Sequence, residues 1–489
     1  MAYITEQNAM KMKLEKGKIL NESSLIKGII DKHKQSSFYK EAISARDYYN
    51  DRHDILNKNF QKFMVKGVAK YNLNAANNRI PNEFFTELID QKVDYVAGNP
   101  PKFTAEDKDT EAVLFADKLN FEFKTYLRVD LIRWLAGSSV SGKDAMLIYI
   151  NEKGAFDYTI VPGEQLIFDR DENRNIISLM RFYYVDYQNE KGLVEDIIRV
   201  EIWDERETWF YIQSKKDGDF ILDISEPVNP LPHFFIGNTS NKDETQGNSW
   251  GEIPFIFLPN NINEKSDLSR IKTLIDSYDL LISKGINNIQ DIQEVVYVLR
   301  GYDGTDLDTF METLKINKAI RVDAEGGADV IKAEIPVQAI TEFEKLLRKN
   351  IYAFGRGVDF SDESFAGDAS GISLKYKFAR LDLKANQIIA QLELAILNLI
   401  RFYAKYLLIK TNQDYTKIYE NINFKISKRM IINEAEMITN VQSSLGILSN
   451  RTILENHPYV HDVDKELERK KEEEVLTPNI NFDTVNNVN

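Results

Sequence analysis

The sequence predicts an α+β fold that is mainly helical, and two patterns carry this prediction. Apolar residues recur every three or four positions along several long segments, as they do on one face of an amphipathic helix. Between residues 145 and 258 the pattern changes to short β-branched and aromatic runs separated by turn-forming glycines. The chain has 489 residues, 43% hydrophobic and 28% charged, which leaves room for roughly three or four folded domains.

The first 100 residues are predicted to be helical. Segment 81–98 has an apolar stripe that ends at Gly98, a residue type common at helix C-termini, and two prolines follow at positions 100 and 101. The stripe consists of Phe85, Leu88, Ile89, Val93 and Val96. A second amphipathic helix is expected at about 107–136.

A β-rich part follows these helices. Strands are expected at 145–150, 179–185, 197–203, 208–213, 220–223 and 253–258. Gly154, Gly192 and the Asp217–Gly218 pair mark turns between them. This order predicts one antiparallel meander, which packs against the N-terminal helices to form a single α+β domain.

The run from residue 264 to residue 410 is the most informative part of the sequence. A long helix is expected at 264–293, with apolar residues at Leu268, Ile271, Ile275, Tyr278, Ile282, Ile286, Ile289 and Ile292. A small lobe at 294–336 interrupts it, with a strand at 295–300, a short helix at 305–314 and two strands divided by glycines 326 and 327. A second helix, 337–354, then carries a stripe of Ile340, Phe343, Leu347, Ile351 and Phe354.

An acidic loop and another long helix complete this run. Gly355 and Gly357 end the second helix, and the segment 358–371 is rich in Asp, Ser and Gly. Loops of this length without regular structure are usually functional or disordered, because compact domains otherwise keep their connections short. A functional loop is therefore favoured over the alternative, an ordinary surface connection. The last long helix begins at about residue 372. This layout suits a ring in which each copy contributes two helices and a mobile loop to a central channel.

The C-terminal part is predicted to return to the fold and then close it. A strand is expected at 422–426, and two or three helices follow, with Ser449 as the N-cap of one of them. The charged run 465–474 leads into an Asn-rich tail, 477–489, which we expect to be mobile.

Charge and composition exclude several classes of protein. The net charge of -14 argues against broad neutralisation of nucleic-acid phosphates, although it is compatible with DNA that slides past an acidic wall. The absence of cysteine excludes disulfides, thiolate zinc sites and cysteine nucleophiles. Segment 1–20 lacks the apolar core of a signal peptide, and no apolar run approaches the roughly 18 residues of a membrane span. We therefore expect a cytoplasmic protein, or part of an assembly built in the cytoplasm, with no membrane partner.

Segment 137–144 resembles the phosphate-binding loop of an NTPase, from Gly137 through Gly142 and Lys143. Such a loop requires a strand before it and a helix after it. Here a helix is predicted before the glycines and a strand after them, and Asp144 replaces the hydroxyl residue that would bind magnesium. A structural turn is the better interpretation.

Two further patterns suggest metal sites only weakly. Asp169 and Asp171 imitate the start of a calcium loop, but Arg174 stands at the position of the required glycine, so we predict a hairpin turn. His457 and His461 have helical metal-pair spacing, yet a proline separates them and no other ligands accompany them. The sequence contains no serine-hydrolase elbow and no zinc-protease helix motif. We therefore predict no catalytic site, no metal and no cofactor.

In the order of its parts, the chain resembles the portal proteins of tailed bacteriophages with long, non-contractile tails. The resemblance is carried by segments 77–100, 266–278, 365–372 and 462–469, and it covers nearly the whole chain. It implies a ring, usually of twelve subunits, at one capsid vertex, through which double-stranded DNA enters during packaging and leaves at infection. It also implies a virion location, with host cytoplasm during assembly, and no hydrolysis by the portal itself.

The resemblance further implies a division of the chain into named parts. Residues 1–262 and about 411–430 would form the wing, 264–293 and 337–354 the stem, 294–336 the clip, 355–371 the tunnel loop and 431–489 the crown. The segment 372–430 would contain the long helix and the return to the wing. The implied partners are other copies of the chain, DNA without sequence specificity, the large terminase, the major capsid and scaffolding proteins, and a head–tail adaptor.

Candidate functional residues fall into four groups. Those expected to face DNA from the loop are Asp359, Ser361, Asp362, Glu363, Phe365, Asp368 and Ser370. Gly355, Gly357 and Gly371 are expected to act as loop hinges. Lys345, Arg348, Lys349 and Arg356 form either a solvated face or a sparse basic ring around DNA. The residues expected to dock partners on the clip are Arg300, Tyr302, Lys318 and Arg321.

Two other functions compete with this interpretation. One is a different phage structural ring, such as a head–tail connector or a baseplate component. The other is a nucleic-acid-dependent NTPase, which would require Lys143 for ATP turnover.

Overall fold

The computed structural model describes most of the chain. The described residues are 22–73, 75–98, 101–106, 108–172, 176–188, 192–236, 246–291, 296–300, 327–331, 337–361, 371–426, 428, 434–455, 457–460 and 463–476. Helices and strands are both well represented, which confirms the predicted α+β class.

The described N-terminal part contains helices, one hairpin and an extended segment, 76–82, that leads toward α4. The helices are α2 (Glu22–Gln35), α3 (Ser37–Tyr49), the short 3₁₀ turn η1 (Asp54–Asn57) and α4 (Phe84–Val96). Strands β1 (Lys62–Val65) and β2 (Val68–Tyr71) form a hairpin that the sequence prediction missed. Lys66 and Gly67 both adopt positive φ angles, 50° and 80°, which is the geometry of a tight two-residue hairpin turn.

The predicted helix at 107–136 is two helices. After strand β3 (Phe103–Thr104), α5 covers Thr110–Glu122 and α6 covers Lys124–Ser141. They meet at Phe123, whose buried ring packs against Phe156 and Tyr403 from distant parts of the chain. The break therefore results from tertiary packing, which helical periodicity does not reveal.

The β-rich part consists of separate sheets and not of one meander. The larger antiparallel sheet has the order β10-β9-β8-β7-β6, with β11 beside β9. Its strands are β6 (Leu166–Arg170), β7 (Ile176–Gln188), β8 (Val194–Trp203), β9 (Glu207–Gln213), β10 (Phe220–Leu222) and β11 (Leu231–Pro232). The smaller sheet, β14-β4-β5, contains β4 (Lys143–Ile150), β5 (Phe156–Pro162) and β14 (Phe255–Pro259). A separate pair joins β12 (Phe234–Ile236) and β13 (Gln246–Asn248).

The helices of the central run agree with the prediction except at the start of the first helix. The turn η4 (Asp267–Arg270) precedes α7 (Lys272–Asp291), so the helix starts later than the predicted residue 264. Ser266 caps η4 by accepting a hydrogen bond from the Leu268 N–H. Strands β15 (Val296–Arg300) and β16 (Gly327–Ile331) form an antiparallel pair, and α9 covers Val337–Gly355. The predicted short helix at 305–314 lies outside the described residues.

The long helix α10 (Gly371–Thr411) is present as predicted. After it, η6 (Tyr419–Asn421) and β17 (Asn423–Phe424) return to pair with β3. Three short helices follow, α11 (Glu434–Ser443), α12 (Asn450–Glu455) and α13 (Val463–Leu476). Ser449 Oγ accepts from the Thr452 N–H, which confirms the predicted N-cap. The tail 477–489 lies outside the described residues.

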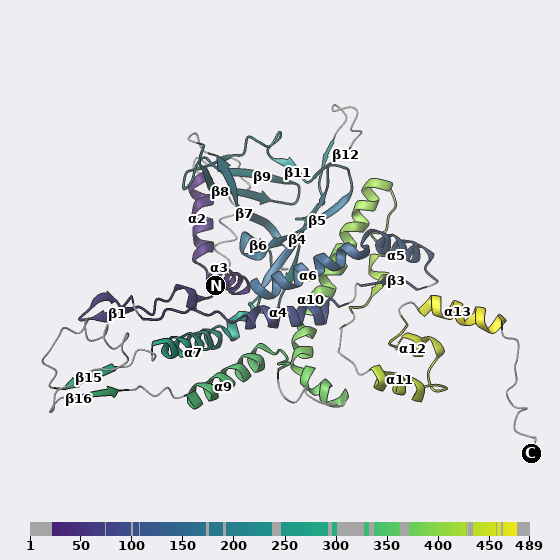
Figure 1. Cartoon of the computed structure of the whole chain (residues 1–489). Coiled ribbons are helices and arrows are strands. Elements are labelled where there is room, and N and C mark those ends of the chain that lie inside the picture. Colours follow the sequence, from purple (N-terminus) through teal and green to yellow (C-terminus); the bar gives the residue numbers. More distant parts are fainter. Residues whose placement is uncertain are drawn as a thin grey trace, which may run out of the picture.

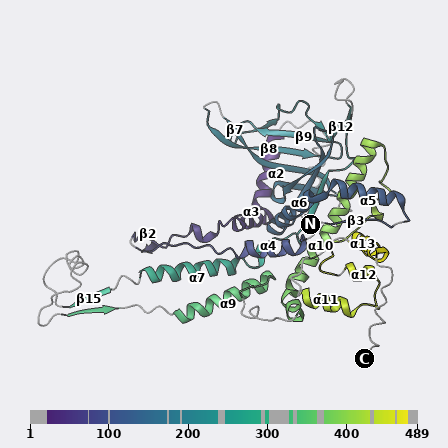
Figure 2. The same ribbon diagram turned by 45° about the vertical axis from the view of Figure 1, so that its right-hand side comes forward.

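The largest core joins α3, α4, α5, α6 and α10 around the fully buried Trp134. A second cluster packs α2 against one face of the larger sheet. Figures 1 and 2 show the sheets at one end of the molecule, with α7 and α9 side by side and extended away from them toward β15 and β16. Among the described helices, none is long and apolar enough to cross a membrane.

Candidate functional site

A row of polar side chains on α7 holds the extended segment 76–82. The row occupies one helix face at four-residue steps, and each side-chain oxygen accepts a backbone N–H at 2.7–3.0 Å. The pairs are Asp279 with Asn82, Ser283 with Ile80, Asn287 with Asn78 and Asp291 with Ala76. Four helical residues advance about 6 Å and two extended residues about 6.6 Å, so the two repeats match along the row.

The inner end of this row is a buried His–Asp pair. His53 Nδ1 lies 2.7 Å from Asp279 Oδ2, and both side chains are almost fully buried. The Tyr48 ring stacks on His53 with a centroid distance of 4.3 Å. The second oxygen of Asp279 accepts from both the backbone and the side chain of Asn82. Asp279 thus fixes α7 to the N-terminal helices and to segment 76–82 at the same time.

The chain leaves α9 in a conformation that α4 fixes. A Cβ atom on Gly355 or Gly357 would lie 2.6 Å or 2.0 Å from a methyl group of Leu88. The Gln91 side-chain amide donates to the Val358 carbonyl at 2.8 Å and accepts from the Val358 N–H at 2.9 Å. Packing requires glycine at these two positions, because only a residue without a side chain allows α4 to approach this closely. Their predicted action as hinges stays a prediction.

Arg348 binds the first acidic residue of the loop. Its Nε and Nη2 donate to the two oxygens of Asp359 at 2.8 and 2.9 Å. Asp359 also accepts from the backbone N–H and the hydroxyl of Ser361. Burial acts to raise the pKa of Asp359, but hydrogen bonds from Arg348 and Ser361 outweigh it and hold that pKa below its usual value. The predicted basic residue and the predicted loop residues thus meet within one chain.

The remaining predicted residues occupy different surroundings. Lys345 and Lys349 are exposed on α9, and Arg356 is partly exposed with a positive φ of 57°. Gly371 is the first residue of α10, and Arg300 ends β15 opposite Gly327. The predicted residues that lie outside the described part are Tyr302, Lys318, Arg321, Asp362, Glu363, Phe365, Asp368 and Ser370.

A buried cluster of two lysines and one aspartate lies beside residues 355–359, which form the root of the loop. Asp267 Oδ2 is 3.2 Å from Lys92 Nζ and 2.9 Å from Lys384 Nζ. Lys384 also donates to the Gly355 carbonyl at 2.9 Å, and Lys92 donates to Ser139 and Asn260. Burial lowers the pKa of Lys92 to about 8, with Asp267 opposing the shift and Lys384 adding to it. The Asp267 carboxylate is therefore the shared ion-pair partner of two buried ammonium groups.

The comparison with known protein families bears on all of these contacts. The model of the family described as "Phage portal protein, SPP1 Gp6-like" matches residues 29–475. The chain belongs to this portal family. The match includes α4, α7, α9, the loop root and α10, so the buried cluster and the α7 row both lie within the matched residues.

Individual portal proteins are similar over most of their length. The portal protein of Bacillus phage SPP1 is 29% identical over 465 residues, which cover 92% of this chain and 86% of that protein. The portal protein of Clostridium phage phiCD119 is 27% identical, over 88% of this chain and 93% of that protein. A solved chain titled "Neck of empty GTA particle computed with C6 symmetry" aligns with a TM-score of 0.42 and 10% identity, over 76% of this chain and 89% of that one. That score is too low to support an argument about the fold.

The segment that resembles a phosphate loop is a structural turn, as predicted. Helix α6 precedes Gly142 and strand β4 follows it, the reverse of the order that phosphate binding needs. Lys143 Nζ pairs with Glu264 at 2.5 Å and lies 4.5 and 4.6 Å from the ring centres of Phe38 and Phe168. Because this ammonium is enclosed by a carboxylate and two rings, it is not placed for nucleotide. Portal proteins are structural components, which agrees with the prediction that the chain is not an enzyme.

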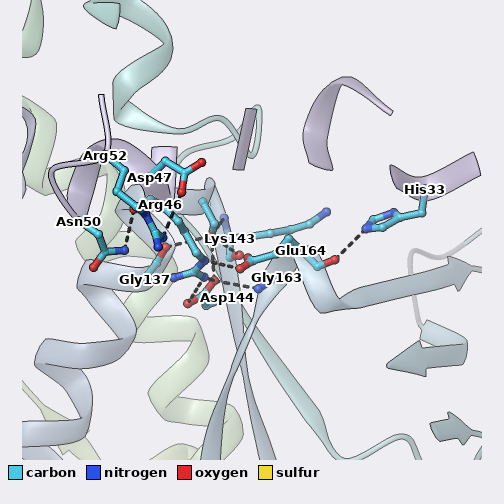
Figure 3. Close-up of polar contacts among 11 residues, drawn as sticks. His33, Arg46, Asp47, Asn50, Arg52, Gly137, Lys143, Asp144, Gly163 and Glu164 are labelled. Carbon is cyan, nitrogen blue, oxygen red and sulfur yellow. Dashed lines mark hydrogen bonds and ion pairs between the residues drawn. The ribbon is translucent and has the colours of Figure 1, made fainter. Parts of the chain in front are cut away.

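Asp144 is the centre of the polar cluster shown in Figure 3. Its carboxylate accepts from Arg46 Nη2 at 3.0 and 3.2 Å, from Ser141 and from the Gly163 N–H. Burial raises the pKa of Asp144 to about 6, although Arg46 acts in the opposite direction. A Cβ atom on Gly137 would lie 1.9 Å from this carboxylate, so the glycine is required by packing.

The patterns that suggested metal sites also have structural explanations. Strands β6 and β7 form the hairpin predicted at Asp169. His457 Nδ1 accepts from the Tyr459 N–H, and His461 lies outside the described residues. Within the described part of the chain, no group of His, Asp or Glu side chains is arranged to hold a metal ion.

Sequence analysis missed the residues that hold the loop root. Lys92 stands four residues after Leu88 on the apolar stripe of α4, and Lys384 stands between Leu381 and Ile388 on that of α10. A charged residue at an apolar position of a helix predicts burial with a partner. That signal could have identified both lysines, but not their shared aspartate.

The lowered pKa of Lys92 predicts a pH dependence of stability. Between the folded pKa of about 8 and the unfolded value near 10.5, the unfolded chain binds more protons, so stability rises with pH. Relative to the Lys92→Met variant, the wild type should gain on the order of 2–3 kcal/mol between pH 7 and pH 10. Urea unfolding of both proteins at the two pH values measures this difference. Identical pH profiles would contradict the assignment.

Proposed function

We propose that this chain forms the portal ring at one vertex of a phage capsid, the channel through which double-stranded DNA passes during packaging and ejection. The observation that carries the proposal is the match to the portal family over residues 29–475. The ring has twelve copies, binds DNA without sequence specificity, and docks the large terminase during packaging and a head–tail adaptor afterwards. The major capsid and scaffolding proteins surround it in the virion.

In this proposal α7 and α9 form the stem, β15 and β16 belong to the clip, and residues 434–476 to the crown. The wing combines the N-terminal helices, the sheets and the segment after α10. One feature of α9 supports a ring, because the helix exposes Phe343, Leu346 and Phe354 by 59%, 51% and 56%. Large apolar side chains on one helix face are unfavourable in water and are normally covered by a partner.

The segment 355–371 is proposed as the tunnel loop, which contacts DNA in the channel. Its root is held by three sets of contacts: Leu88 and Gln91 of α4, Arg348 of α9, and Lys384 of α10. A loop that touches a moving duplex requires such an anchor, because otherwise the force on its tip would displace its base. Lys345 and Lys349, exposed on α9, are proposed to meet DNA phosphates loosely.

Deletion of residues 362–370 tests the loop assignment. This deletion leaves Val358 and Asp359 with their anchoring contacts, so rings should still form, as seen by negative-stain electron microscopy and native mass. Packaging or retention of DNA should fall, measured as nuclease-protected DNA per particle. Restoring the length with nine Gly and Ser residues controls for loop length. Normal packaging by the deletion variant would show that the loop does not act on DNA.

A further inference from the structure

Two oppositely charged surfaces flank the loop root, and the function proposed above assigns neither of them. The first is an acidic stripe along α4 and its N-cap residue, formed by Glu83, Glu87, Asp90 and Asp94 at steps of four, three and four residues. All four are exposed and line a groove with Phe84, Tyr278 and Phe360. Arg348 is the single cation lining this groove in the described part of the chain, and it is bound to Asp359.

The stripe is unfavourable in one isolated copy. Like charges three or four residues apart on a helix repel each other. Although Asp90 is exposed, its carboxyl is partly removed from water, which raises its pKa. Asp94 adds to the rise, and a hydrogen bond from Tyr49 opposes it. A cationic partner would remove this repulsion.

The second surface is a cationic pocket on the other side of the root. Of its lining residues in the described structure, five are cations and one is a carboxylate. The cations are Lys92, Lys265, Arg270, Arg356 and Lys384. The carboxylate, Asp267, is already shared by the two buried lysines. The pocket therefore carries excess positive charge in a chain whose net charge is -14.

The two surfaces lie on opposite sides of α4. At about 100° per residue, Lys92 points about 140–160° away from Glu87, Asp90 and Asp94 around the α4 axis. Phe354, Gly355 and Arg356 line the pocket, and Arg348 and Phe360 line the groove, so both surfaces border the same end of α9. Neighbouring copies in a ring are related by rotation about the ring axis, and this rotation does not shift a surface along the axis. Each contact in a closed ring therefore joins one surface of a copy to a different surface of its neighbour.

We propose that in the portal ring the acidic stripe of one copy docks into the cationic pocket of the next. This inference rests on the proposed ring. The charges are complementary, and a neighbour's carboxylates would balance the pocket that Asp267 alone leaves positive. The contact would also connect the loop roots around the ring, because each root lies between the two surfaces of its own copy.

Charge reversal tests the contact. Two double variants, Asp90→Lys with Asp94→Lys and Lys265→Glu with Arg270→Glu, change exposed residues outside the buried cluster and the loop root. Each should lose the ring and give the monomer mass at a concentration where the wild type is a ring. The fourfold variant, in which both sides are reversed, should recover the ring. Far-ultraviolet circular dichroism of the monomers checks that they fold.

Cysteine cross-linking provides a second readout, since the chain has no cysteine of its own. The variant with both Asp94→Cys and Arg270→Cys should give a ladder of disulfide-linked copies under mild oxidation, whereas each single variant should stay monomeric in a denaturing gel. Intact rings without a ladder would overturn the inference.

The outcomes separate this inference from the portal assignment. Rings that survive both reversals overturn the contact and leave the portal assignment standing. Rings that survive the Lys265→Glu and Arg270→Glu reversal but retain less DNA overturn it in favour of a pocket for DNA phosphates. A wild-type chain that forms no ring overturns both. Loss of the ring in each double variant and its recovery in the fourfold variant support the contact.

Discussion

Replacement of Asp279 by alanine is expected to lower the free energy of unfolding by about 3–5 kcal/mol. The change would leave the buried His53 side chain and two Asn82 donors without their acceptor. An unpaired buried polar group loses its hydration without recovering a hydrogen bond. It would also remove the inner contact of the row that joins α7 to segment 76–82.

Urea unfolding at matched protein concentrations measures this effect, because the proposed ring assembly would add to the apparent stability. Ser277→Ala is the matched control, two residues away on the exposed side of α7. It should change stability by less than about 0.5 kcal/mol. A loss below about 1 kcal/mol for Asp279→Ala would contradict the role assigned to the His–Asp pair.

The Asp267→Ala variant is expected to lose a similar amount, about 3–5 kcal/mol, because it removes the one carboxylate between two buried ammonium groups. Burial acts to raise the pKa of Asp267, but Lys384 and Lys92 hold it well below its usual range, so its contribution is fully present at neutral pH. Lys384 would also hold the Gly355 carbonyl less firmly.

A triple variant separates charge from packing in this cluster. When Lys92→Met and Lys384→Met are added to Asp267→Ala, most of the lost stability should return, since no buried charge remains unpaired. Asn263→Ala, a nearby exposed change, serves as the control. If the triple variant is no more stable than Asp267→Ala in urea unfolding, the loss comes from packing and not from unpaired charge.

Long periodic helices were predicted well from the sequence. Helix α10 extends over 41 residues, and α9 and α4 also lie where their apolar stripes placed them. For α4 and α10, burial of one continuous apolar stripe favours the helix, and that stripe is a local property of the sequence. On α9 the stripe is buried only in part, since Ile351 is buried whereas Phe343 and Phe354 are exposed. The prediction that the segment around Lys143 is a structural turn also used local information, because it depended on the order of one helix and one strand.

Two of three errors have a nonlocal cause, and the third, at the start of α7, has a local one. The break at Phe123 depends on Phe156 and Tyr403, which are distant in sequence. The smaller sheet forms because β14 pairs with β4, placing Phe255 opposite Leu147. The start of α7 at Lys272 depends on the η4 turn and its Ser266 cap, which the spacing of apolar residues does not indicate.

The sequence by itself determined the mainly helical α+β class, the positions of the long helices, the lack of a nucleotide loop and the resemblance to portal proteins. Each of these depends on residue spacing or on the order of neighbouring elements. Only the tertiary structure decided how the loop root is held and which charges meet. The partners of Lys92 and His53 lie 175 and 226 residues away, and no local spacing specifies such a pairing. Burial removes these charges from water, so their partners are set by which elements pack together.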